Sequence, residues 1–65
     1  MNDNNRLLGV REVMKRTSLS LTFIKRLRKA GDFPLAVPLG DRRIGFLERE
    51  LDQWINARAA MRAAA

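Results

Sequence analysis

No cysteine and no histidine occur among the 65 residues of this chain, and their absence limits how it can fold. A domain of this length is near the lower limit for a core that is stable without a disulfide or a structural metal, and the residues that usually form these are missing. The fold must therefore depend on a small apolar core. Because histidine is also the commonest general base, and no nucleophile–base pair or glycine-rich phosphate loop stands out, we expect no enzymatic activity, no catalytic residue, no cofactor and no metal.

The sequence gives no indication of a membrane or secreted protein. Its longest apolar run is far shorter than the ~20 residues of a membrane-spanning helix. The first five residues, Met-Asn-Asp-Asn-Asn, are polar and do not show the basic-then-apolar order of a signal peptide. We therefore expect a cytoplasmic protein with no membrane partner, in which residues 1–5 form a disordered tail.

Capping residues and helix breakers divide the first half of the chain into two short helices. Apolar residues repeat at helical spacing after Gly9, which predicts a helix over 10–16. Ser20 is a suitable N-cap for a second helix over 21–29, whose inward stripe contains an isoleucine and a leucine. Gly31 is placed to end that helix in a left-handed conformation. Two short helices joined by a tight turn form the helix-turn-helix pattern.

A β-hairpin is predicted after the two helices. Apolar runs over 33–39 and 43–47 flank a Gly-Asp-Arg turn. Pro38 has no N–H, so its strand should lie at the edge of the sheet, and Gly45 leaves room for a bulge or a close backbone approach. A further apolar stub, Arg6-Leu7-Leu8, can dock as a short strand.

A third helix is predicted from about residue 48, because apolar residues including Trp54 follow a helical stripe. Trp54, Phe33 and Phe46 are expected in the core. The expected fold class is α+β, mostly helical: a small winged helix-turn-helix over 6–58, followed by an Ala-rich tail over 59–65 that is either helical or frayed.

The positive charge is concentrated on the two predicted helices. The formal net charge is +6, and residues 10–31 carry seven Lys and Arg against one Glu, which equals the whole net charge. Residues 32–52 carry more acidic than basic side chains. A basic helix-turn-helix of this kind is typical of proteins that bind double-stranded DNA.

The helix-turn-helix pattern also predicts which residues contact DNA. The second helix enters the major groove, which is about 12 Å wide, and its N-terminal residues point toward base edges. The candidates on this helix and its cap are Ser20, Thr22, Lys25, Arg26 and Lys29. At the tip of the hairpin, the candidates for a wing are Arg42 and Arg43. Candidate contacts to the phosphate backbone on the first helix are Arg11, Lys15 and Arg16.

Structural roles compete with these predictions. Thr22 can cap its helix, Lys29 can complement the helix dipole, and one wing arginine can pair with Glu48 or Asp52. Leu21 and Phe23, near the start of the second helix, can touch a thymine methyl group or pack under the wing.

The residues also resemble a known family. The matching positions are Arg6-Leu7-Leu8, Glu12-Val13, Leu19-Ser20, Ile24, Arg26-Leu27, Gly31, Phe33-Pro34, Val37, Leu39-Gly40, Arg42, Phe46, Glu50-Leu51 and Trp54-Ile55. Their order and spacing are similar to those of AlpA-type prophage regulators, which belong with the excisionase-like, MerR-like winged helix-turn-helix proteins. The resemblance implies a DNA-binding accessory protein of a bacterial mobile element, associated with the nucleoid. It also implies a role in excision with a site-specific integrase, in transcriptional control, or in both.

Two departures from the family pattern affect the predicted interface. Ser18 occupies a turn position that is usually glycine in the family, so a left-handed backbone is expected there at a cost of ~1–2 kcal/mol. Leu21-Thr22-Phe23 replaces a start of the second helix that is usually polar or basic.

Other functions remain open at this stage. One recognition helix and one wing contact few base pairs, so we expect several copies to bind cooperatively and bend the DNA, as a dyad dimer or a head-to-tail filament. The main alternative is a small basic adaptor that binds an acidic protein and has no DNA target. RNA binding is less favoured, because exposed aromatic pairs for base stacking are lacking.

Overall fold

The computed structural model describes residues 6–62, and its elements follow in the order β1, α1, α2, β2, β3 and α3. The strands are β1 (Leu7–Leu8), β2 (Val37–Pro38) and β3 (Ile44–Leu47). The helices are α1 (Val10–Thr17), α2 (Leu21–Ala30) and α3 (Glu48–Met61). The predicted class is confirmed: a small, mostly helical α+β fold with the arrangement of a winged helix-turn-helix.

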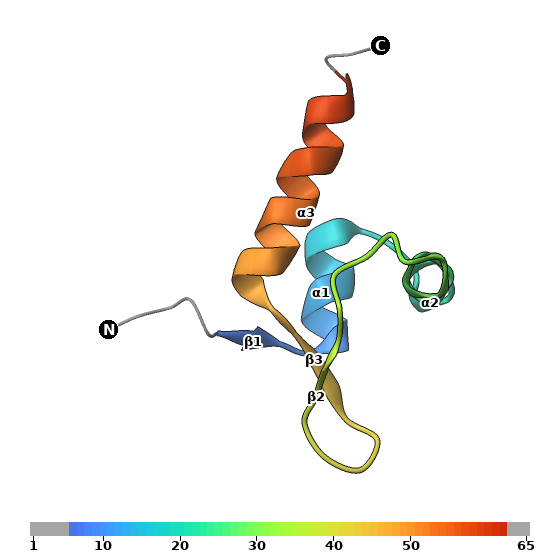
Figure 1. Ribbon diagram of the computed structural model, residues 1–65, viewed down its shortest axis with the longest axis vertical. Helices are drawn as coiled ribbons and strands as arrows, with labels where there is room; N and C mark the ends of the chain where they lie inside the picture. The colour runs from blue at the N-terminus through green and yellow to red at the C-terminus, as the bar shows by residue number, and fades with distance from the viewer. Residues whose placement is uncertain (1–5, 63–65) are drawn as a thin grey trace.

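The elements extend in three directions from the centre of the molecule. In Figure 1, α3 rises from the end of β3, the β2–β3 hairpin extends the opposite way, and α2 lies to one side, seen end-on.

The Ala-rich end is helical as far as Met61, whereas the disordered tail expected over 1–5 lies outside the described residues. None of the helices within 6–62 has the length and apolar character needed to cross a membrane.

β3 is the central strand of a three-stranded antiparallel sheet with the order β1-β3-β2. Pro38 pairs with Ile44 on the outer strand β2, so its predicted edge position is confirmed. The close backbone approach expected at Gly45 is also present. A Cβ added at Gly45 would lie 2.9 Å from Leu39 Cδ1 and 3.3 Å from the carbonyl oxygen of Leu8. The hairpin and β1 therefore pack closely around this glycine.

The core lies where the helices meet the sheet. Its buried members come from all three helices, two strands and the loop after α2: Leu8, Val13, Ile24, Phe33, Phe46 and Leu51. The Phe33 ring makes edge contacts with Phe46 at 5.5 Å and with Trp54 at 4.8 Å between centroids. Trp54 is only partly buried, and its Nε1 donates a hydrogen bond of 2.7 Å to the carbonyl oxygen of Asp32. Phe33 and Phe46 therefore lie in the core as predicted, and Trp54 packs against it and links the loop after α2 to α3.

The turn between α1 and α2 has the strained backbone that the sequence predicted. Ser18 has φ 61° and ψ 22°, a left-handed conformation, and its N–H donates to the carbonyl oxygen of Met14 at 2.8 Å. Thr17 Oγ1 donates to the carbonyl oxygen of Val13 at 2.8 Å and accepts from the N–H of Leu19 at 3.3 Å. These local bonds fix the angle at which α2 leaves α1.

Candidate nucleic-acid interface

Local chemistry fixes both ends of α2. The Ser20 hydroxyl accepts a hydrogen bond of 3.1 Å from the N–H of Phe23, so Ser20 is the N-cap. At the other end, Gly31 has φ 78°, and the N–H of Asp32 donates to the carbonyl oxygen of Leu27 at 2.8 Å. Ser20 itself is exposed, and its hydroxyl proton remains available for donation to an acceptor outside the protein.

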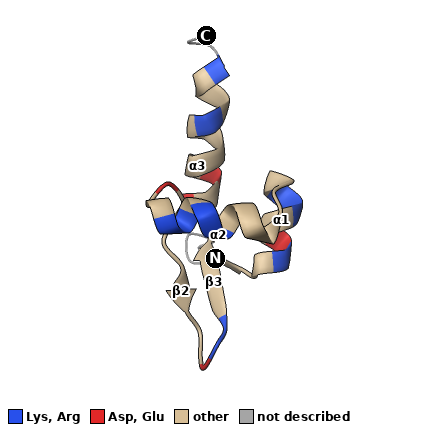
Figure 2. Cartoon of the chain, turned by 90° about the vertical axis from the view of Figure 1, so that its right-hand side faces the viewer, with Lys and Arg blue, Asp and Glu red and all other residues tan. Residues whose placement is uncertain are grey.

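One face of α2 is polar, basic and exposed. Ile24 is buried and Leu27 is half-buried, and they define the inward side of the helix. Because successive residues are rotated by about 100° around a helix, the side opposite to these two carries Thr22, Lys25, Arg26 and Lys29. All four are exposed, and Figure 2 shows the basic segments of α2 across the front of the molecule. We name this set of four residues the α2 face.

The wing presents its arginines at the free end of the hairpin. The N–H of Leu39 donates to the carbonyl oxygen of Arg43 at 2.9 Å, which closes the loop over 40–43. Arg42 and Arg43 are both exposed, and within residues 6–62 neither forms an ion pair. Figure 2 shows this basic segment below α2, on the hairpin that extends from the body. The two predicted DNA-contacting elements are therefore presented together.

The two apolar residues at the start of α2 lie on opposite flanks of the helix. Leu21 lines a groove shared with the wing residues Arg42 and Ile44, whereas Phe23 lines a second groove formed with α3. Each is 40% exposed, so neither is fully packed under the wing. The Arg26 guanidinium carbon lies 6.0 Å from the centre of the Phe23 ring, close enough for a cation–π contact.

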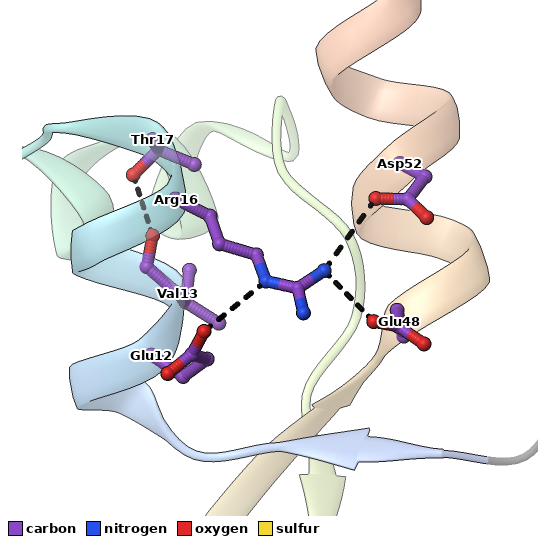
Figure 3. Close-up of polar contacts among 6 residues, drawn as sticks. All are labelled: Glu12, Val13, Arg16, Thr17, Glu48 and Asp52. Carbon is purple, nitrogen blue, oxygen red and sulfur yellow. Dashed lines mark hydrogen bonds and ion pairs between the residues drawn. The ribbon is translucent and has the colours of Figure 1, made fainter.

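Arg16, predicted to contact the phosphate backbone, is the centre of a partly exposed ion-pair network between α1 and α3 (Figure 3). Its Nε lies 3.3 Å from Glu12 Oε2, and its Nη1 lies 2.8 Å from Glu48 Oε2 and 3.8 Å from Asp52 Oδ1. Hydrogen bonds to Glu12 and Glu48 raise the pKa of the Arg16 guanidinium above its ordinary value. The carboxylates proposed as partners for a wing arginine are thus paired with α1.

We expect the Arg16→Ala variant to melt at a lower temperature than the wild type, because Glu48 and Asp52 on α3 lose their contact with α1. The difference should narrow in high salt, which screens exposed charges. The matched control is Lys15→Ala, which removes the same charge from a neighbouring exposed residue that has no ion pair within 6–62. Equal melting temperatures for the two variants would show that the network does not join α1 to α3.

The other two candidates on α1, Arg11 and Lys15, are exposed.

A further basic residue, Arg28, was not among the predicted contacts, yet it lies on the flank of α2 that faces the wing. It lines the same groove as Leu21 and Arg42. Its spacing of three residues from Lys25 is compatible with a shared flank, but the sequence alone does not show where the wing lies.

Two comparisons with known proteins found similar sequences. Residues 6–59 match a family described as "Prophage CP4-57 regulatory protein (AlpA)". The chain is also 39% identical over 57 residues to "Uncharacterized protein ORF88" of Enterobacteria phage P4. That alignment covers 88% of this chain and 65% of the phage protein.

Proposed function

The chain belongs to the AlpA family of prophage regulatory proteins, and from this premise we propose that it acts by binding double-stranded DNA. The observation that carries the proposal is the α2 face, four exposed polar or basic residues on one side of the second helix of a helix-turn-helix. In the proposed complex α2 occupies the major groove, and the wing arginines contact the backbone or the neighbouring minor groove. The protein acts through occupancy of its site, without making or breaking a bond.

The regulatory outcome that we propose is control of a mobile element. Binding near the ends of the element would assist a site-specific integrase in excision, and binding near a promoter would change transcription. Both outcomes need the same domain on DNA. Because a single helix and wing contact few base pairs, we propose that several copies bind together and bend the DNA.

Fluorescence anisotropy of a labelled 30-base-pair duplex tests DNA binding at several salt concentrations. We expect the affinity to fall steeply with salt, because each phosphate contact releases counterions. The double variant Arg42→Ala/Arg43→Ala should bind about 10-fold more weakly and lower the slope of log K against log salt by one to two. A folded wild-type protein that fails to bind duplex DNA at low salt would refute the proposal and favour the protein-adaptor alternative.

A further inference from the structure

A groove of about 290 Å³ separates α2 from the wing. Its lining combines basic and apolar side chains and contains no acidic residue: Val10, Leu21, Ile24, Lys25, Arg28, Arg42, Ile44 and Phe46. Resting on the DNA-binding function proposed above, we propose that this groove holds one strand of the DNA backbone. In this proposal Arg28 acts with Lys25 and Arg42 as a phosphate clamp, a term we use for these three residues.

The composition of the groove fits a phosphodiester strand. Three cations from two elements, α2 and the wing, line the groove together with the apolar side chains of Leu21, which is 40% exposed, and Ile44, which is half-buried. A DNA backbone has the matching parts, because its phosphates are anionic and its deoxyribose rings present C–H surface. The absence of a carboxylate from the lining means that no internal partner within the groove competes for the cations.

The residues from α2 form a regular stripe. Leu21, Ile24, Lys25 and Arg28 follow the spacing i, i+3, i+4 and i+7, which places them on one flank of the helix. That flank is next to the α2 face and toward the hairpin. A helix in the major groove and a wing on the adjacent minor groove are separated by one backbone strand, so the groove lies where that strand has to pass.

Arg28 is held in place by a core residue. Its guanidinium carbon lies 5.8 Å from the centre of the Phe46 ring, and Phe46 has no exposed surface. This distance is within the range of a cation–π contact, and the five N–H donors of a guanidinium suit a bidentate phosphate contact. Within residues 6–62 no carboxylate forms an ion pair with Arg28. The fold therefore places this cation at the groove, with no carboxylate partner in the described part of the chain.

A matched control exists on α3. The Arg58 guanidinium lies 4.9 Å from the centre of the Trp54 ring, so it too contacts a core aromatic, but it is not part of the groove between α2 and the wing. Arg28→Ala and Arg58→Ala each remove one charge and one cation–π contact. Their comparison separates a phosphate contact from the general effects of charge and stability.

The experiment measures anisotropy of a labelled 30-base-pair duplex of random sequence with both variants, over a series of salt concentrations. We expect Arg28→Ala to weaken binding about 5- to 10-fold and to lower the slope of log K against log salt by about one, whereas Arg58→Ala leaves the slope unchanged. Arg28→Lys should restore the slope, because the charge returns. Circular dichroism melts show whether each variant is folded at the temperature of the titration. If Arg28→Ala is not folded there, Arg28→Gln takes its place, because glutamine keeps most of the aliphatic stem of arginine.

The outcomes distinguish the clamp from the proposed function. If Arg28→Ala and Arg58→Ala show the same affinity and slope while the wild type binds duplex DNA, the clamp is refuted and DNA binding stands. If the wild type binds an acidic peptide but no duplex, the proposed function fails and the clamp with it. If Arg28→Ala lowers the slope of log K against log salt and Arg58→Ala does not, the result supports both the phosphate clamp and the proposed DNA binding.

Discussion

Phe46→Ala should unfold at a much lower urea concentration than the wild type. Phe46 has no exposed surface, lies on the central strand β3, and makes an edge contact with Phe33. Replacing a buried phenylalanine by alanine costs about 3–5 kcal/mol, because the transfer free energy is lost and a cavity remains. A domain of this length is expected to have a total stability of roughly 3 to 10 kcal/mol. The substitution therefore removes a large part of the free energy of unfolding.

Urea unfolding followed by circular dichroism measures this effect. The control is Phe46→Leu, which keeps an apolar side chain of similar volume and should cost less than about 1.5 kcal/mol. If Phe46→Ala unfolds at nearly the same urea concentration as the wild type, the core does not depend on this ring. Because both substitutions remove the ring that Arg28 contacts, each folded variant should also bind duplex DNA more weakly than the wild type.

Local chemistry explains why much of the fold was predictable. Ser20 and Gly31 mark the ends of α2, and the sequence identifies both because capping depends on neighbouring residues. The left-handed backbone at Ser18 was predicted from a resemblance to a family that usually has glycine there. The helical period also located the α2 face, since the inward positions of Ile24 and Leu27 determine which residues lie opposite.

Long-range packing explains what the sequence could not show. Arg16 and Glu12 lie one helical turn apart on α1, whereas the contacts of Arg16 with Glu48 and Asp52 exist only because β3 and α3 fold back against α1. For the same reason Arg28 was not predicted as a contact. Its flank lines a groove only because the wing packs beside α2.

The largest expected effect on DNA binding belongs to the double variant Arg26→Ala/Lys29→Ala. Both residues are exposed on the α2 face, one helical turn apart, where the proposed complex places the major groove and its phosphates. Loss of an arginine contact to a base costs about 1–3 kcal/mol, and loss of a lysine–phosphate contact weakens binding at every sequence. Since 1.4 kcal/mol is a factor of ten, the combined loss should be on the order of 100-fold in Kd.

A control with the same net charge makes this result specific to the α2 face. Arg58→Ala/Arg62→Ala also removes two positive charges, but from the C-terminal part of α3 and its C-cap residue, at the end of the helix that points away from the hairpin (Figure 1). Anisotropy titrations of both double variants with the same duplex should show a loss of about 100-fold for the first and less than about threefold for the second. Equal losses would mean that the protein attracts DNA only through its overall charge. In that case α2 would not be the recognition helix.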